Sequence, residues 1–170
     1  MKIVITGFMG CGKTRLAREL ARRLDLEMLD LDDRITECEG RTPAQLIVDD
    51  GEEAFRVIES EILREVLETD TARVIALGGG AWIVEGNRAL VDRYGYLSVW
   101  LDTPFEVCWA RIEASAEDRP LGRTREQAQA RYDQRRPFYQ LAKIHVPVTG
   151  DEDLDSLVTR SVHRLHKFSV

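Results

Sequence analysis

The first residues that could do chemistry are positions 7 to 14, which read Gly-Phe-Met-Gly-Cys-Gly-Lys-Thr. This G-x-x-x-x-G-K-[ST] pattern follows an apolar run and precedes a helical pattern, which is the context of a phosphate-binding loop. Its glycines let backbone N–H groups face phosphate oxygens, and the helix adds the positive end of its dipole. We expect Lys13 to reach the β- and γ-phosphates and Thr14 to bind Mg²⁺. A glycine-rich turn without nucleotide is the alternative, and the motif alone does not separate a kinase from a hydrolase or a switch protein.

Two carboxylates follow the second apolar run of the chain, at Asp30 and Asp32. In an open parallel sheet, ligands bind beyond the carboxyl ends of the strands, so these side chains are expected at the site. One carboxylate could hold Mg²⁺ through water, and the other could accept a proton or hydrogen bond from a substrate hydroxyl. Helix capping is an equally acceptable interpretation, because Asp is common before a helix.

Arg56 and a run of three glycines are further candidates for substrate binding. Arg56 is either an exposed residue paired with Glu59, or a planar fork for a substrate carboxylate that Glu59 holds in place. Gly78–Gly80 follow another apolar run. They form either a flexible turn or a place where the backbone approaches a ligand closely, and we favour the second.

The segment from Ser115 to Gln134 is polar and contains Arg119, Arg123, Arg125 and Arg131. It is either a solvated loop with a surface helix or a mobile lid over an anionic substrate. Composition alone does not separate the two.

Short apolar runs alternate with helical patterns along the chain, which predicts an α/β fold with a parallel sheet. The strand candidates lie around Ile3–Thr6, Glu27–Asp30, Val74–Leu77, Leu97–Leu101 and Ile144–Val148. Most are continuously apolar, as expected for strands covered on both faces. One helical stripe consists of Leu16, Ala17, Leu20, Ala21 and Leu24, and a second of Phe55, Ile58, Ile62, Leu63, Val66 and Leu67. With 170 residues and no linker, residues 1–170 are expected to form one domain.

The net charge of −6 argues against binding to nucleic acid or to anionic membranes. The three cysteines have no C-x-x-C spacing, so neither a disulfide framework nor a zinc site is predicted. The first apolar run is too short for a signal peptide, and we expect a cytoplasmic monomer.

Six motifs in this order resemble the shikimate kinases, a family within the nucleoside-monophosphate-kinase group of P-loop proteins. They are Gly7–Thr14, the D-x-D pair Asp30 and Asp32, G-E-x-x-F-R-x-x-E at Gly51–Glu59, Gly78–Gly80, Arg119-Pro120-Leu121 and R-x-P-x-Y at Arg135–Tyr139. After Leu121 the chain departs from the family, with Gly122 where a second leucine is usual.

The resemblance implies a three-layer P-loop kinase fold, with a five-stranded parallel sheet in the order 2-3-1-4-5, a shikimate-binding region over 32–60 and a lid over 115–125. It implies that ATP phosphorylates shikimate at its 3-hydroxyl. Lys13, Asp32 and Arg119 would be catalytic, and Thr14 and Asp30 would hold Mg²⁺. The nucleotide would contact Gly10, Cys11, Gly12, Lys13, Thr14, Arg15, Arg111 and Arg119. Shikimate would contact Asp32, Arg56, Gly78, Gly79, Gly80 and Arg135, with Arg56 and Arg135 on its carboxylate.

Two rival functions remain open from the sequence. Another small-molecule kinase, such as a gluconate kinase, would keep the phosphate-binding loop but not the combination of Arg56, Gly78–Gly80 and Arg135. A regulatory protein that has lost catalysis would bind MgATP and form no phosphorylated product.

Overall fold

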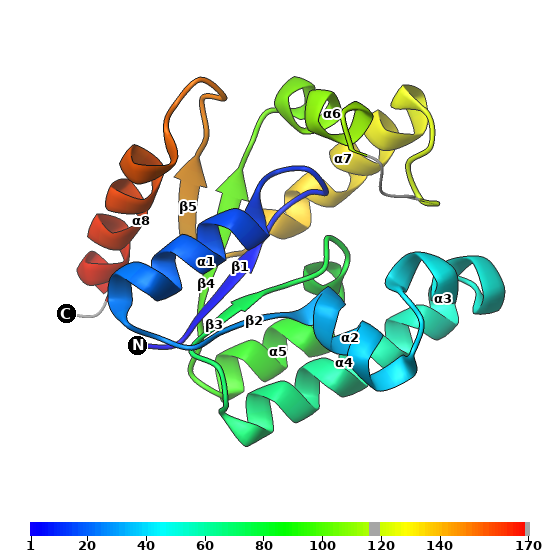
Figure 1. Cartoon of the computed structure of the whole chain (residues 1–170), viewed down its shortest axis with the longest axis horizontal. Coiled ribbons are helices and arrows are strands. Elements are labelled where there is room, and N and C mark those ends of the chain that lie inside the picture. Colours follow the sequence, from blue (N-terminus) through cyan, green and yellow to red (C-terminus); the bar gives the residue numbers. More distant parts are fainter. Residues whose placement is uncertain (116–119, 169–170) are drawn as a thin grey trace.

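The computed structural model of the chain describes residues 1–115 and 120–168 (Figure 1). Its centre is a five-stranded parallel sheet in the order β2-β3-β1-β4-β5, which confirms the predicted order. The strands are β1 (Ile3–Thr6), β2 (Met28–Asp30), β3 (Val74–Ala76), β4 (Leu97–Asp102) and β5 (Ile144–Pro147). All five strand candidates are confirmed, with ends that differ from the predicted ones by at most one residue.

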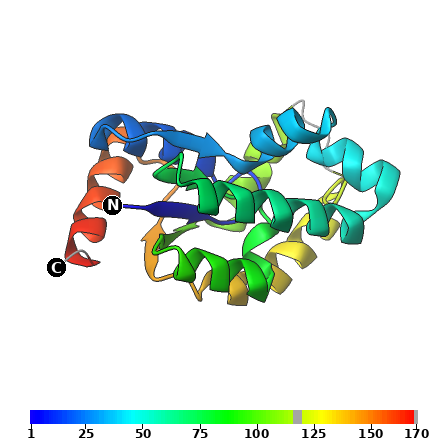
Figure 2. The same ribbon diagram turned by 90° about the horizontal axis from the view of Figure 1, so that it is seen from below.

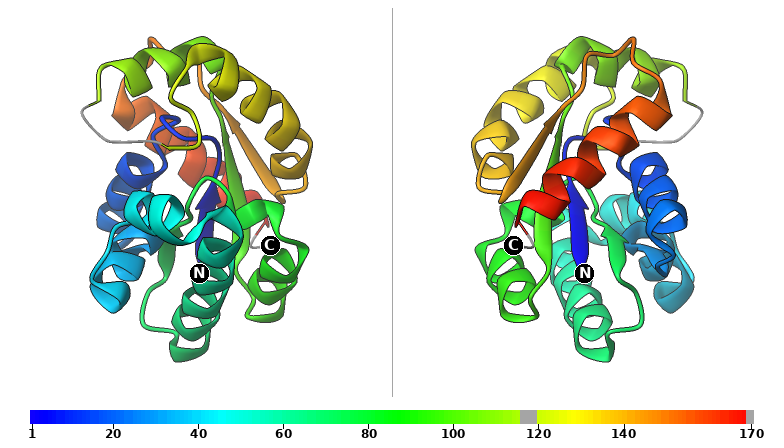
Figure 3. Two further views of the ribbon diagram at one scale, coloured as in Figure 1. Left: turned by 90° about the vertical axis from the view of Figure 1, so that its right-hand side faces the viewer. Right: turned by 90° about the vertical axis from the view of Figure 1, so that its left-hand side faces the viewer.

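Helices cover both faces of the sheet, so the fold has three layers. Helices α1 (Lys13–Leu24) and α8 (Leu154–Phe168) pack together on one face, and α4 (Glu52–Thr69) and α5 (Glu85–Arg93) pack together on the other (Figure 3). Seen from below, α1 and α5 lie on opposite sides of β1 (Figure 2). The remaining helices are α2 (Leu31–Glu39), α3 (Pro43–Asp50), the short 3₁₀ helix η1 (Ala81–Ile83), α6 (Phe105–Glu113) and α7 (Arg125–Tyr139).

Burial explains why the strands read as continuous apolar runs. All four residues of β1, the central strand, are buried, and so are the three residues of β3 beside it. The two edge strands, β2 and β5, are only partly buried. Helices cover both faces of the inner strands, so side chains on either face of such a strand lie in the core. An alternating pattern would therefore bury polar side chains.

Both predicted helical stripes face the core, with one correction. In α1, Leu16, Ala17, Leu20 and Ala21 are buried, and Leu24 is partly buried against the core. In α4, Ile58 is only partly buried, whereas Glu59, which had been considered only as a partner for Arg56, is completely buried. A carboxylate inside the apolar stripe is costly unless it is paired, so its position marks α4 as a helix with more than a packing role.

The polar segment 115–134 contains the start of a helix. Helix α7 begins at Arg125 and is capped by Thr124, whose hydroxyl accepts from the backbone N–H of Gln127 while the Gln127 side chain accepts from that of Thr124. The surface-helix interpretation is therefore right for the second half of the segment. Arg119 lies outside the described residues, so the lid over 115–125 stays a prediction. No helix within residues 1–115 and 120–168 is long and apolar enough to cross a membrane.

Candidate active site

The loop between β1 and α1 has the backbone of a phosphate cradle. Gly10 and Gly12 adopt positive φ angles of 74° and 100°, a region that residues with a side chain rarely adopt. A methyl group on Gly10 would also lie 2.6 Å from the backbone oxygen of Cys108, on α6. Helix α1 then starts at Lys13 with no side chain capping its first turn. Its free N–H groups and dipole therefore point at the space in front of the loop.

Lys13 and Thr14 extend from the first turn of α1. The ammonium group of Lys13 donates to the backbone oxygen of Phe8 at 3.0 Å, which holds it across the loop. The hydroxyl of Thr14 donates to Asp30 Oδ2 at 2.7 Å. Thr14 and Asp30 are thus neighbours, although Thr14 follows β1 and Asp30 is the last residue of β2.

Asp30 has two roles, one for each carboxylate oxygen. Its Oδ1 accepts from the backbone N–H of Asp32 at 3.0 Å and caps α2, so the capping interpretation is right for this residue. Its Oδ2 faces Thr14, and two oxygen donors side by side suit Mg²⁺. No group of three His, Cys, Asp or Glu side chains that could hold a metal occurs in the described part of the chain. Mg²⁺ commonly binds one or two protein groups and completes its shell with phosphates and water, so this arrangement fits it.

Asp32 does not cap the helix, and its environment changes its acidity. Burial, followed by the charges of Asp30 and Glu59, raises the pKa of Asp32 to about 7. Its Oδ1 is so close to Gly78 that a methyl group there would lie only 2.8 Å away. A carboxyl group with a pKa near neutrality can both take up and release a proton at physiological pH.

Arg56 is held between two carboxylates of its own helix. Its Nη1 donates to Glu59 Oε2 at 2.6 Å, and its Nη2 donates to Glu52 Oε1 at 3.1 Å. Burial raises the pKa of Glu59, while Arg56 and Arg135 oppose that effect. The interpretation of Arg56 as an exposed surface residue is therefore not supported, because only 19% of its side chain is exposed.

Arg135 comes from α7, far along the chain, and lies beside the same group of charges. Its side chain is 6% exposed, and its Nη2 lies 3.5 Å from Glu52 Oε1. The neighbouring Tyr139 donates to the backbone oxygen of Gly79 at 2.5 Å, which fixes the end of α7 on the glycine run. The structure thus brings Arg56 and Arg135 together at Glu52, as the family resemblance implied.

The glycine run has little room for side chains. A methyl group on Gly78 would lie 2.6 Å from Glu59 Oε1, and one on Gly80 would overlap the guanidinium group of Arg56. Glu59 Oε1 has no hydrogen-bond partner within the described residues, and it lies against this run. Gly78 and Gly80 therefore leave room for the charged side chains of α4, which favours close packing over a flexible turn, and the approach of this backbone to a ligand stays a prediction.

These groups open into one cavity of about 1030 Å³. Sequence-predicted residues in its wall are Gly10, Gly12, Lys13, Thr14, Arg15, Asp30, Asp32, Arg56, Gly78, Gly79, Gly80 and Arg135. Residues from α3, with Pro120 and Leu121, line it as well. Cys11 is buried and does not line the cavity, and Arg111 donates to the backbone oxygens of Gly10 and Cys11 at 3.3 and 3.0 Å. Arg111 therefore supports the loop, and its contact with adenine stays a prediction.

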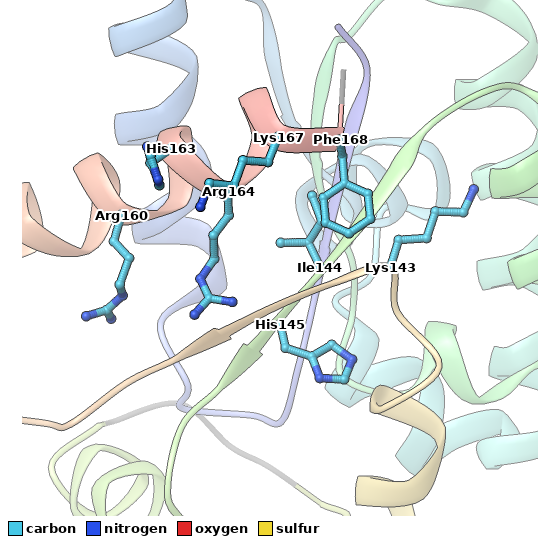
Figure 4. A pocket seen from close by; sticks show the side chains of 8 residues that line it. All are labelled: Lys143, Ile144, His145, Arg160, His163, Arg164, Lys167 and Phe168. Atoms are coloured by element: carbon cyan, nitrogen blue, oxygen red, sulfur yellow. The ribbon is translucent and has the colours of Figure 1, made fainter. Parts of the chain in front are cut away.

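A second hollow, of about 580 Å³, lies between α8 and β5 (Figure 4). Its wall is basic and includes Lys143, His145, Arg160, His163, Arg164 and Lys167. It contains none of the sequence-predicted residues, and it includes the start of β5. The carboxyl ends of the strands, where ligands bind in such sheets, lie at the opposite edge. The cavity at the phosphate-binding loop is therefore the candidate active site.

Sequence reasoning missed three residues of the charged group around Arg56. Glu52 lies inside the motif Gly51–Glu59, and Tyr139 ends the motif Arg135–Tyr139. The sequence signal for both residues was therefore present. Arg131 was noted only as part of the polar segment, although it lies four residues before Arg135. This spacing places two residues on the same face of a helix.

Comparison with known proteins decides the family. The family model of shikimate kinase matches residues 9–166. The chain belongs to the shikimate kinase family. The shikimate kinase of Cereibacter sphaeroides is 37% identical over 161 residues, which cover 93% of this chain and 79% of that one.

Solved structures of shikimate kinases agree with the fold of this family member. The enzyme from Bacteroides thetaiotaomicron superposes with a TM-score of 0.86 at 31% identity, over 98% of both chains. The enzyme from Acinetobacter baumannii, solved in complex with shikimate, superposes with a TM-score of 0.89 at 29% identity, over 99% of this chain and 94% of that one. The chain is thus a phosphotransferase of the shikimate kinase family, and ATP is the phosphoryl donor that the family implies.

Proposed function

We propose that this chain transfers the γ-phosphoryl group of ATP to the 3-hydroxyl of shikimate, with Mg²⁺ bound beside Thr14 and Asp30. The observation that supports the acceptor most directly is Arg135. Its side chain is 6% exposed, and its ion pair within the described residues is long, at 3.5 Å to Glu52. Because a buried cation is costly without a close partner, the cavity wall favours an acceptor that brings a carboxylate.

The reaction needs few chemical steps from the protein. The acceptor oxygen forms a bond to the γ-phosphorus, the bond from that phosphorus to the β,γ-bridging oxygen breaks, and ADP leaves. Asp32 takes the proton of the acceptor hydroxyl, while Lys13 and the backbone N–H groups of the loop stabilise the transferring charge. Mg²⁺ would neutralise charge on the β- and γ-phosphates. The role of Arg119 toward the same phosphates stays a prediction, because this residue lies outside the described part of the chain.

An acceptor panel tests the proposal. ADP release from MgATP should depend on shikimate, and quinate, gluconate and nucleoside monophosphates should support much less of it. Formation of shikimate 3-phosphate should equal ADP release, which mass spectrometry can check. If another acceptor is phosphorylated and shikimate is not, the assignment of the substrate is wrong.

The pKa of Asp32 predicts the pH dependence of the reaction. Because Asp32 must be ionised to accept a proton, kcat/KM for shikimate should rise with pH, pass its midpoint near pH 7 and level off above it. The pKa is raised, so activity is lost as the pH falls through 7 rather than through the ordinary range of an aspartate. Initial rates between pH 5.5 and 9 at saturating MgATP measure the midpoint. A profile that stays flat down to pH 5.5 would contradict this role.

Gly80→Ala should weaken acceptor binding without affecting the nucleotide. The new methyl group overlaps the Arg56 guanidinium, so Arg56 must leave its contact with Glu59. A displacement of about 1 Å in a bound reactant can cost about 10²-fold, and we expect a loss of this order in kcat/KM for shikimate. Gly86→Ala is the matched control, because nothing lies within 4 Å of a methyl group there. Equal losses for ATP and shikimate would mean that the glycine run supports the whole fold.

A further inference from the structure

Glu52, in the first turn of α4, lies within reach of three arginines. Its Oε1 is 3.1 Å from Arg56 Nη2 and 3.5 Å from Arg135 Nη2. Arg131 Nη1 lies 3.3 Å from each of the two Glu52 oxygens. Burial alone would raise the pKa of Glu52, but the hydrogen bond from Arg56 and the charges of all three arginines lower it. The side chain is therefore ionised at neutral pH.

This carboxylate contacts the two arginines to which the proposed function assigns the acceptor carboxylate. Both terminal nitrogens of Arg56 already face protein carboxylates, Nη1 toward Glu59 and Nη2 toward Glu52. Each terminal nitrogen has a second N–H group, so an acceptor carboxylate that takes both nitrogens as a bidentate pair competes with these two contacts for the guanidinium. Glu59 is fully buried and its contact with Arg56 is short, at 2.6 Å. Glu52 has 36% of its side chain exposed and longer contacts, so it is the one that can move.

Arg131 is placed to keep Glu52 after such a move. It precedes Arg135 by one helical turn, so both lie on the same face of α7. Neither Glu52 nor Arg131 lines the cavity, whereas Arg56 and Arg135 do. Contact of Arg131 with both oxygens of Glu52 gives this carboxylate a partner outside the cavity.

We propose that Glu52 is a place-holding carboxylate, which pairs with Arg56 and Arg135 until the acceptor carboxylate displaces it, and that Arg131 is the positioning residue that retains it on the outer side. This inference rests on the proposed function, because it concerns the same acceptor site. Glu52 keeps the two cavity arginines paired and oriented before the acceptor binds. Arg131 lowers the free energy needed to displace Glu52, because the displaced carboxylate remains paired.

The inference predicts that two neutral substitutions act in opposite directions. Glu52→Gln removes the competitor and should lower the KM and the Kd for shikimate. Arg131→Gln leaves Glu52 with Arg56 and Arg135 alone and should raise both constants. Partly exposed ion pairs contribute modestly, so each change should be about 2- to 5-fold. The effect of Arg131→Gln should disappear when Glu52→Gln is also present, because there is then no carboxylate to retain.

The test is a double-mutant cycle of Glu52→Gln and Arg131→Gln. Steady-state rates give kcat, KM for shikimate and KM for ATP, and calorimetry gives the Kd for shikimate. We expect the changes to lie in the constants for shikimate, with kcat and KM for ATP close to those of the unmodified chain. Arg131→Lys, which keeps the charge, should restore part of the affinity. Arg22→Gln is the matched control. It removes an exposed arginine of α1 that pairs with Glu19 of α1.

The outcomes separate this inference from the proposed function. If the unmodified chain does not phosphorylate shikimate, the proposed function fails, whatever the variants do. Suppose that the unmodified chain does phosphorylate shikimate. The inference is wrong if Glu52→Gln weakens shikimate binding and if Arg131→Gln weakens it further in the chain that already carries Glu52→Gln. Glu52 would then only support the arginines, and Arg131 would act on the acceptor directly. Circular dichroism and thermal unfolding of each variant show whether a loss of binding comes from a loss of structure.

Discussion

The Asp32→Asn variant should lose about 10²- to 10⁴-fold in kcat, the range typical for removal of a general base. Asparagine has nearly the same shape as aspartate, but it cannot take the proton of the acceptor hydroxyl. Asp32 is placed for that task, because it lies in the cavity wall beside Gly78 and has a pKa of about 7. Single-turnover rates with saturating MgATP and shikimate measure the loss without interference from product release.

The pH profile provides a second measurement on the same variant. The midpoint near pH 7 should vanish from the remaining activity, because the group that titrates there is gone. Glu37→Gln is a suitable control, since Glu37 lies on the same helix with 68% of its side chain exposed and paired with Arg34. Near-normal kcat in Asp32→Asn would show that Asp32 only binds the acceptor. An unchanged midpoint would assign the pKa to another group.

Lys13→Ala should lower kcat by about 10²-fold or more, as expected when a group that stabilises the transition state is removed. The ammonium group lies across the loop, held by the backbone oxygen of Phe8, at the start of α1. Its attraction to the phosphates strengthens as negative charge moves during transfer, so kcat should fall as well as ATP affinity. Steady-state kinetics and nucleotide titration separate these two effects.

Lys143→Ala is the control for the loss of a lysine. Lys143 lies in the basic hollow between α8 and β5 and pairs with Asp92. We expect its turnover to remain near that of the unmodified chain, because this hollow lies away from the carboxyl ends of the strands. Near-normal turnover in Lys13→Ala would overturn the proposed mechanism of phosphate stabilisation.

Differences between the two variants also identify which half of the site each residue serves. Asp32→Asn should leave the affinity for ATP nearly unchanged, because its carboxylate acts on the acceptor. Lys13→Ala should leave the affinity for shikimate nearly unchanged in the absence of nucleotide.

Local sequence patterns were enough to predict the five strands and the phosphate-binding loop. The five strands were predictable because buried parallel strands must be apolar along their whole length, and the runs of β1 and β3 have this property. The loop was predictable because its function depends on backbone conformation and a helix start, which Gly10, Gly12 and Lys13 specify locally. The order of the sheet and the approach of Arg56 to Arg135 came from the family resemblance, since neither follows from local patterns.

The arrangement of the charges at the acceptor site follows from the packing of distant segments. Glu52 and Arg131 are 79 positions apart, and their contact arises because α4 and α7 both pack against η1. No local pattern carries that information. The pKa of Asp32 likewise depends on burial and on charges that α1, β2 and α4 bring together. Sequence motifs can name a carboxylate or a guanidinium, but its burial and its partners follow from the packing of distant segments, and these determine its protonation and its place in the site.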